Sequence, residues 1–316
     1  MRLTVGICTW NRSSLLRQGL ERMTHLIIPA GVEWELLIVN NNCTDDTDSA
    51  IASFASRLPI RRLFQPQPGK SHALNLAVTE ASGEYILWTD DDTLMDQDWL
   101  AAYFRAFQQW PSTVFFGGPI QPWFAVPPPK WLKQAFPHYG SAWHLRDFGE
   151  HPILLNSADR FPYGPNWAIR ANEQRRYPYD PRFGPRAGRH PGGEETLLMR
   201  SLLADGYHGR WVPDARVLHY VPPEHMTTWR LRKIFFGYGR FLALTNPPAR
   251  VAMLFGRPRW AWRHAVTAEG RYWWHRMFSN PERWVGDLIA ASTAWGNLLS
   301  SDTSTERSSA RQSALR

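Results

Sequence analysis

Residues 85–93, YILWTDDDT, join an apolar run to three consecutive aspartates, Asp90, Asp91 and Asp92. A short apolar run of this kind predicts a buried strand, and the aspartates follow its carboxyl end. Adjacent carboxylates repel one another, and a divalent cation is the commonest reason for a folded protein to keep them together, because hard oxygen ligands suit Mg²⁺ or Mn²⁺. The alternative interpretation is a solvated acidic turn that precedes the next helix.

The sequence around this stretch alternates between strand and helix patterns. Further strands are predicted at 3–8, 35–39, 60–64 and 113–118, and helices at 13–25, 45–56, 70–81 and 97–109. Ser13 is expected to cap the first helix, and Asp45 and Asp46 favour the positive end of the second. Helices of about a dozen residues between strands predict an α/β fold with a mostly parallel sheet flanked by helices. In such sheets ligands bind outside the carboxyl ends of the strands.

Beyond residue 118 the pattern changes. Residues 119–165 are rich in proline and aromatic residues and are predicted to form a long functional loop. The remaining predicted elements are, in order, a strand at 166–170, a helix from Glu194 to Ala204, a strand near 208–212, an extended piece ending at His219, amphipathic helices rich in Arg and Trp at 226–299, and a disordered tail at 300–316.

Composition excludes several classes of protein. The chain has 316 residues, of which 43% are hydrophobic and 20% charged, so it is neither a disordered chain nor a collagen-like repeat nor a disulfide-stapled miniprotein. Two cysteines in a chain of this length predict a reduced, cytoplasmic protein. The first apolar run is too short for a signal peptide, and no run of uncharged apolar residues is long enough to span a membrane. Seventeen Trp and 25 Pro suit either the stacking of sugars or bases, or packing in a proline-rich region.

Positive charge is concentrated in the C-terminal third. Residues 1–225 hold 22 Lys and Arg against 23 Asp and Glu, whereas residues 226–316 hold 14 against 5. The arginines there are interleaved with tryptophans, which suits an anionic membrane surface, or a helical cap whose aromatic residues pack on the rest of the protein. A uniformly basic nucleic-acid binder would not divide its charge in this way, so a nucleic-acid partner is not expected, although a basic appendage could still contact nucleic acid.

Seven segments, in order, carry a resemblance to a known family. They are residues 4–12 (TVGICTWNR), 39–47 (VNNNCTDDT), 66–75 (PQPGKSHALN), 90–92 (DDD), 164–170 (GPNWAIR), 193–200 (GEETLLMR) and 213–219 (PDARVLH). Together they resemble glycosyltransferase family 2, the inverting nucleotide-sugar-dependent transferases, over about residues 3–240. The resemblance implies a GT-A-like, nucleotide-binding sheet with a DXD motif.

The resemblance also implies roles for individual residues. A Mn²⁺ or Mg²⁺ ion is expected on Asp92 with Asp90 and His219, although a lone histidine such as His219 is also a common packing residue. A UDP-, GDP- or dTDP-sugar is the expected donor. The residues expected to contact this donor are Thr9, Asn11, Arg12, Asn41, Lys70, Asn75, Asp90 and Asp91. Asn166 and Trp167 are expected to contact the acceptor.

Glu195 is the candidate general base for the acceptor hydroxyl, and Glu194 is its neighbour that could bind the acceptor instead. The alternative for this pair is simple charge at a helix end. Two positions depart from the family pattern. Asn40 and Asn41 stand where the family usually has a carboxylate that binds the base, and Glu195 stands where it usually has Asp.

We therefore predict a metal-dependent hexosyltransferase of polysaccharide or cell-surface glycan biosynthesis, acting on a glycan or lipid-linked acceptor. Its predicted domains are a catalytic domain at 1–225, divided into a nucleotide-binding half at 1–118 and an acceptor-side half at 119–225, a helical extension at 226–299 and the tail. The predicted location is cytoplasmic, with peripheral contact to the cytoplasmic face of the membrane. The alternatives are an inactive binding protein of the same fold and a sugar-phosphate nucleotidyltransferase, although residues 6–12 lack the glycine-rich loop of that class.

Overall fold

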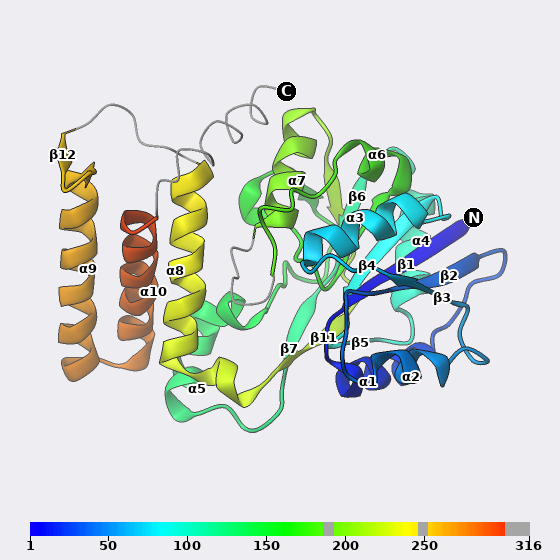
Figure 1. Ribbon diagram of the computed structural model, residues 1–316, viewed down its shortest axis with the longest axis horizontal. Helices are drawn as coiled ribbons and strands as arrows, with labels where there is room; N and C mark the ends of the chain where they lie inside the picture. Colours follow the sequence, from blue (N-terminus) through cyan, green and yellow to red (C-terminus); the bar gives the residue numbers. More distant parts are fainter. Residues whose placement is uncertain (186–192, 246–251, 301–316) are drawn as a thin grey trace. The chain divides into compact units, whose positions relative to one another are not determined.

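A computed structural model describes residues 1–185, 193–245 and 252–300 (Figure 1). The helices are α1 (Ser13–Met23), α2 (Thr47–Ala52), α3 (Lys70–Glu80), α4 (Trp99–Gln109), α5 (Lys130–Tyr139), α6 (Ala171–Arg176), α7 (Glu194–Ala204), α8 (Thr228–Thr245), α9 (Arg259–Phe278) and α10 (Pro281–Leu298). The strands are β1 (Arg2–Thr9), β2 (Glu33–Asn40), β3 (Ile60–Phe64), β4 (Tyr85–Asp90), β5 (Thr93–Met95), β6 (Phe115–Gly117), β7 (Ile120–Phe124), β8 (Leu154–Leu155), β9 (Trp167–Arg170), β10 (Gly209–Trp211), β11 (Val217–Val221), β12 (Met253–Leu254) and β13 (Arg257–Pro258).

An eight-stranded sheet of order β3-β2-β1-β4-β9-β6-β10-β8 forms the centre of the first part of the chain. The strands from β3 to β4 run parallel, and β9 lies antiparallel between β4 and β6. Of the parallel strands, β1, β2 and β4 are largely buried, because helices cover both faces of the sheet, whereas the edge strand β3 is partly exposed. The predicted α/β fold with a mostly parallel sheet is confirmed.

Two apolar clusters, one on each face, hold the helices against this sheet. Leu3, Val5 and Ile7 of β1 pack with residues of α1, α2 and α4. Leu37 and Val39 of β2 pack on the opposite face with residues of α3 and α7. Figure 1 shows α1 and α2 on one side of the parallel strands and α3 on the other. The alternation of side chains along each strand therefore produces a three-layer sandwich whose carboxyl edge is left free for a site.

A second, three-stranded sheet of order β5-β11-β7 lies beyond the aspartates. The strand β5 follows them directly and pairs antiparallel with β11, in a register that sets His219 opposite Thr93. Neither β5 nor this pairing is predicted by the sequence, because three residues are too few to show a period. The pairing brings His219 beside Asp92.

Several local predictions are wrong. Ser13 is the first residue of α1 rather than its cap; the N-cap position is Arg12, which makes no side-chain capping bond. The second helix is shorter than 45–56, since α2 begins at Thr47 and ends at Ala52. The predicted loop at 119–165 instead contains β7, α5 and β8, with the short 3₁₀ turns η1 (Gly140–Trp143) and η2 (Ala158–Arg160). Proline at the start of a helix is compatible with helical φ, so the proline-rich sequence before Lys130 does not prevent α5.

The described residues form two compact units. The first comprises 1–123, 144–185 and 194–220, and the second comprises 124–143, 221–245 and 252–300 together with Gly193. In the second unit, α10 packs against α8, α9 and α5. Its first turn is defined by Asn280, whose side chain accepts a hydrogen bond from the Arg283 amide, and by Pro281 at the first helical position. A third 3₁₀ turn, η3 (Pro223–Met226), precedes α8.

The predicted helices at 226–299 are confirmed, with the hairpin β12–β13 between α8 and α9. The predicted disordered tail lies outside the described residues, except for Ser300. Among the described residues, no helix is both long enough and apolar enough to cross a membrane.

Candidate functional site

The three aspartates lie where β4 ends, next to the end of β1. The parallel register sets Asp90 opposite Cys8, so Thr9 and Asp91 are neighbours. The Thr9 hydroxyl donates a hydrogen bond of 2.8 Å to Oδ2 of Asp91. Asp91 and Asp92 are buried, because β5 and β11 cover the turn that follows β4. The predicted acidic motif is therefore an enclosed cluster rather than a solvated turn.

Arg12 supplies positive charge to this cluster. One of its terminal nitrogens lies 2.6 Å from Oδ2 of Asp92 and 3.2 Å from Oδ1 of Asp91. Burial raises the pKa of Asp91 to about 7, with a further contribution from the charge of Asp92. Burial likewise raises the pKa of Asp92 to about 6, against the opposing effect of Arg12. One arginine therefore does not balance the buried carboxylates, and the cluster would gain from a further cation.

Asp90, Asp92 and His219 present ligand atoms that lie within 4.8 Å of one another. Nδ1 of His219 lies 3.1 Å from the carbonyl oxygen of Tyr220, which can only accept, so Nδ1 carries the proton. Burial lowers the pKa of His219 to about 4, so the ring is neutral and Nε2 presents a lone pair.

That lone pair faces Oδ1 of Asp92 at 3.3 Å. This buried oxygen receives no hydrogen bond within the described part of the chain. Two electron-rich atoms held this close in a buried position repel each other unless a proton or a metal cation lies between them. The donor set therefore fits Mg²⁺ or Mn²⁺.

Lys70 connects the aspartates to the second pair of carboxylates. Its Nζ lies 2.9 Å from Oδ1 of Asp90 and 3.5 Å from Oε1 of Glu195. Lys70 is the first residue of α3, and Glu195 lies in the first turn of α7. A Cβ atom at Gly164 would lie 2.5 Å from Oε1 of Glu195, so a larger residue at this position would displace the glutamate side chain. The predicted lysine, aspartate and glutamate are thus brought together in one site.

Glu194 and Glu195 have different surroundings. Glu194 is buried, and burial together with the charge of Glu195 raises its pKa to about 8. Its carboxyl group is therefore protonated at neutral pH. Glu195 keeps partial access to solvent and pairs with Lys70. Of the two, Glu195 is the one whose oxygens are available to a substrate.

The three asparagines predicted to bind the donor form hydrogen bonds with the backbone of neighbouring segments. Asn11, with a left-handed φ of 51°, accepts a 2.7 Å hydrogen bond from the Thr44 amide. Asn41 accepts from the Gly69 amide and donates to two backbone carbonyls before α3. Asn75 forms a pair of 2.8 Å bonds with the backbone of Tyr179. Their proposed contacts with a ligand remain predictions.

Asn166 and Trp167, which are predicted to contact the acceptor, are both buried. Asn166 is fully buried and accepts from Trp99 Nε1 and the Tyr103 hydroxyl. Its amide nitrogen donates to the carbonyls of Pro119 and Ala215. Trp167, the first residue of β9, is buried in the apolar cluster on the α3 face of the sheet. Both side chains are buried, and their proposed contacts with an acceptor remain predictions.

Two residues near the site have no signal in the sequence. The His144 ring stacks on His219, with ring centroids 4.1 Å apart, and its backbone has a left-handed φ of 65°. The hydroxyl of Tyr179 is buried and without a hydrogen-bond partner within the described residues, close to the charges of Glu195 and Lys70. Neither residue belongs to a motif, and only the fold places them here.

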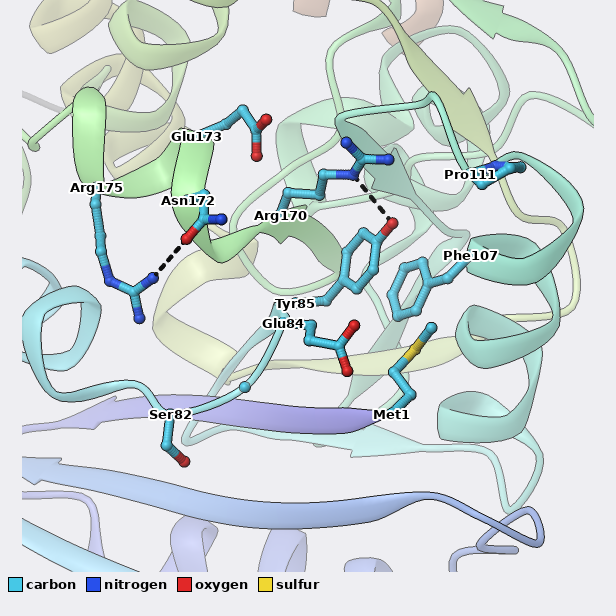
Figure 2. Close-up of a pocket in the computed structure, with 11 residues that line it drawn as sticks. Met1, Ser82, Glu84, Tyr85, Phe107, Pro111, Arg170, Asn172, Glu173 and Arg175 are labelled. Carbon is cyan, nitrogen blue, oxygen red and sulfur yellow. Dashed lines mark hydrogen bonds between the residues drawn. The ribbon is translucent and has the colours of Figure 1, made fainter.

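A separate cavity of about 530 Å³ lies at the opposite end of the same strands (Figure 2). Its lining includes Met1 and Glu84, which precede β1 and β4, and Arg170, whose Nε donates to the Tyr85 hydroxyl at 3.2 Å. Arg175 is bonded there to Asn172, as Figure 2 shows. None of the predicted site residues lines this cavity, so the candidate site is the carboxyl edge of the sheet.

Comparison with known proteins agrees with this placement. The profile of the family described as "Glycosyl transferase family 2" matches residues 4–172. The succinoglycan biosynthesis protein ExoM of Rhizobium meliloti (strain 1021) is 20% identical over 249 residues, which are 77% of this chain and 76% of that protein.

Two solved structures show the same fold. The mannosyltransferase PcManGT from Pyrobaculum calidifontis, in complex with GDP-Man and Mn²⁺, has a TM-score of 0.54 and 17% identity, covering 99% of this chain and 74% of that one. S. aureus TarS 1-349, in complex with UDP-GlcNAc, has a TM-score of 0.52 and 15% identity, covering 99% and 92%.

Proposed function

The chain belongs to glycosyltransferase family 2 and has the GT-A type of fold, and on this premise we propose that it is an inverting hexosyltransferase. It would move a sugar from a nucleoside-diphosphate donor to a hydroxyl group of a glycan or other acceptor. One observation carries the proposal: the aspartate cluster with His219 is joined through Lys70 to a carboxylate, Glu195, on another element. The reaction requires that the charge of the leaving diphosphate is neutralised and that a base accepts the proton of the acceptor hydroxyl. The proposed residues for both tasks are neighbours in this site.

The donor would bind at the carboxyl ends of β1 and β4 with Mn²⁺ or Mg²⁺. Asp90, Asp92 and His219 would hold the ion, which when bound neutralises charge on the leaving diphosphate. Arg12 is half exposed beside them and Lys70 lies on their other side, so both can contact diphosphate oxygens. The related structures contain UDP-GlcNAc and GDP-Man, and UDP-, GDP- and dTDP-sugars are the donors to test.

Glu195 would take the proton of the acceptor hydroxyl. Its Oε1 lies 3.5 Å from Nζ of Lys70, and a bound diphosphate would compete for the same ammonium group. The carboxylate of Glu195 would then be released toward the acceptor. Glu194, protonated and buried, would support the start of α7 and take no proton.

The acceptor would be a growing surface glycan or a lipid-linked one. The support for this class is the relative named for succinoglycan biosynthesis, which spans most of this chain. The aromatic residues of the predicted loop offer surfaces for a sugar, and Trp123, which packs edge-on against Tyr220 at 5.1 Å, is partly exposed near β11. Sugars bind such flat faces through their C–H groups.

The test is the release of nucleoside diphosphate from a panel of nucleotide sugars in Mn²⁺, in the presence and absence of a glycan acceptor. Asp92→Asn should abolish release and Mn²⁺-dependent nucleotide binding, because its carboxylate is a proposed ligand. Asp96→Asn is the matched control: a half-exposed aspartate four residues further along the chain, which should leave release unchanged.

Two outcomes would replace the proposal. Metal-dependent nucleotide binding without release from any donor would indicate an inactive binding protein. Pyrophosphate formation from a nucleoside triphosphate and a sugar phosphate would indicate a nucleotidyltransferase.

A further inference from the structure

In α9, the outermost helix of the second unit, most of the large apolar side chains face solvent. A helix on the surface of a protein in water usually buries such side chains. The buried residues of α9 are Ala261, Ala265, Ala268 and one large aromatic, Tyr272, and the helix packs against α10. Its other face exposes aromatic and aliphatic side chains, each at least half accessible: Trp260, Val266, Trp273, Trp274, Met277 and Phe278. A surface helix normally shows the opposite division. Contiguous exposed apolar surface of this kind marks an interaction site.

The hairpin β12–β13 extends this face at the start of α9. Phe255 at its tip is 83% exposed and has a left-handed φ of 48°, an uncommon conformation for a bulky residue. Trp262 holds the hairpin on the helix, since its Nε1 donates a 3.0 Å hydrogen bond to the Leu254 carbonyl. Met253 and Leu254 are exposed beside the tip. The hairpin thus presents apolar side chains outward instead of burying them.

Arginines are interleaved with these apolar residues. Arg259 and Arg263 are exposed on α9 and form no ion pair within the described part of the chain. The acidic residue of α9, Glu269, is already bonded to Arg232 at 2.9 and 3.0 Å. The outward face therefore combines positive charge and apolar area without any negative charge.

The combination of positive charge and exposed apolar area favours one of three possible partners for this face. A second copy of the chain would bring arginines against arginines. A nucleic acid would satisfy the arginines but leave Met277, Phe278 and Val266 in water. An anionic lipid surface satisfies both groups, because tryptophan and arginine prefer the headgroup layer while the apolar tips enter the acyl boundary. Among the described residues α9 cannot span a membrane, which suits a helix lying in the plane of the surface.

We propose that the exposed face of α9 and the β12–β13 tip form the docking face of this protein on an anionic membrane. The face is long enough for stable contact, since a helix of 20 residues extends about 30 Å. The arginines would attract the anionic lipid and the aromatic residues would insert at the interface. This inference does not depend on the proposed transfer reaction, because no residue of α9 belongs to the candidate site.

The test is co-sedimentation of the full chain with phosphatidylcholine vesicles that contain or lack phosphatidylserine, at low and high salt. We expect binding only to the anionic vesicles and weaker binding at high salt. The double variant Arg259→Glu and Arg263→Glu should reduce partition by roughly tenfold or more. The double variant Trp274→Ser and Phe278→Ser should reduce it at both salt concentrations, because it removes the apolar contribution.

The matched control is Ile27→Ser with Arg160→Glu, which changes an exposed apolar residue and an exposed arginine of the first unit. It should bind vesicles as the wild type does. Equal loss in the control, binding that ignores lipid charge, or no binding would overturn the proposal. So would a dimer in size-exclusion chromatography that the Trp274 and Phe278 changes convert to monomer. Nucleotide binding, measured on the same variants, should stay unchanged and separates this result from a failure of the proposed reaction.

Discussion

Glu194 and Glu195 are adjacent in the chain, yet the fold gives them opposite properties. Burial raises the pKa of Glu194 to about 8, while Glu195 pairs with Lys70 at the edge of the site. A general base must be ionised and must reach the substrate. Of the two, Glu195 is the one that lies where a substrate could reach it, and it is the proposed base.

Glu195→Gln should therefore lower sugar transfer by about 10²-fold or more, the usual scale for the loss of a general base, while donor binding is kept. Glu194→Gln should keep most activity, because a neutral amide replaces a carboxyl group that is already neutral. Steady-state transfer rates and nucleotide affinity of both variants are the measurement. A large loss of rate in Glu194→Gln alone would show that the two roles are reversed.

The raised pKa values of Asp91 and Asp92, about 7 and about 6, predict a pH-dependent response to metal. The folded protein without metal binds more protons than the unfolded chain between about pH 4 and pH 7, so its free energy of unfolding falls as pH rises through this window. A divalent cation must displace these protons.

The increase in melting temperature produced by Mn²⁺ should consequently be small near pH 5 and grow toward about pH 8. Thermal unfolding with and without Mn²⁺ across this range measures it. In Asp92→Asn the Mn²⁺-induced increase should disappear at every pH, because a proposed ligand is lost. A gain that is the same at every pH would argue against a site built on these carboxylates.

At the scale of elements, Asn166 joins parts of the chain that the sequence keeps far apart. Its four hydrogen bonds connect the start of β9 with α4 and with the backbone beside β7 and β11. Each buried group left without a partner costs about 1–3 kcal/mol. Asn166, which stands in a segment that resembles a family motif, therefore links several elements of this fold through its hydrogen bonds.

Asn166→Ala should lower the free energy of unfolding by about 3 kcal/mol or more, as measured by urea denaturation. Asn172→Ala, a change at an exposed asparagine, is the control and should have little effect. If Asn166→Ala keeps wild-type stability but raises the KM for the acceptor, the predicted contact between Asn166 and the acceptor would be supported instead.

The crossing of α8 and α10 depends on two glycines. A Cβ atom at Gly239 would collide with the Thr293 carbonyl oxygen, and one at Gly296 with that of Phe236. Gly296→Ala should destabilise the second unit by about 1–3 kcal/mol or more, because backbone cannot move aside cheaply. Gly270→Ala on α9 meets nothing within 4 Å and should instead stabilise by about 0.5–1 kcal/mol. Equal effects of the two changes in denaturation experiments would contradict this packing.

At the scale of the whole molecule, the chain consists of two compact units, and the candidate site lies wholly in the first. A ligand that binds only the folded state stabilises it by about 2.7 kcal/mol at about 100 times its Kd. For a unit of this size that corresponds to a rise in melting temperature of roughly 5–10 °C.

We therefore expect one of UDP, GDP, dTDP and CDP to raise the melting temperature by this amount in the presence of Mn²⁺ and by much less in its absence. Differential scanning fluorimetry of the wild type and Asp92→Asn is the measurement. A shift that survives in Asp92→Asn would place the nucleotide elsewhere on the molecule.

The sequence by itself determined the alternation of strands and helices, the position of the aspartates at the end of β4, and the start of α7 at Glu194. These features depend on the period of apolar residues and on local preferences, which neighbouring residues decide. The family followed from segments whose spacing reflects that alternation. The same reasoning missed β5 and α5, whose patterns are too short or too rich in proline to be recognised.

Only the tertiary structure decided which glutamate is buried, what Asn166 does, and that His144 stacks on His219. It also decided that α9 turns alanines inward and tryptophans outward. Each of these depends on contacts between residues far apart in the chain, such as the 67 positions that separate Asn166 from Trp99. A local pattern records the type of each side chain, whereas burial, and with it charge state and accessibility, is set by whatever the rest of the chain packs against it.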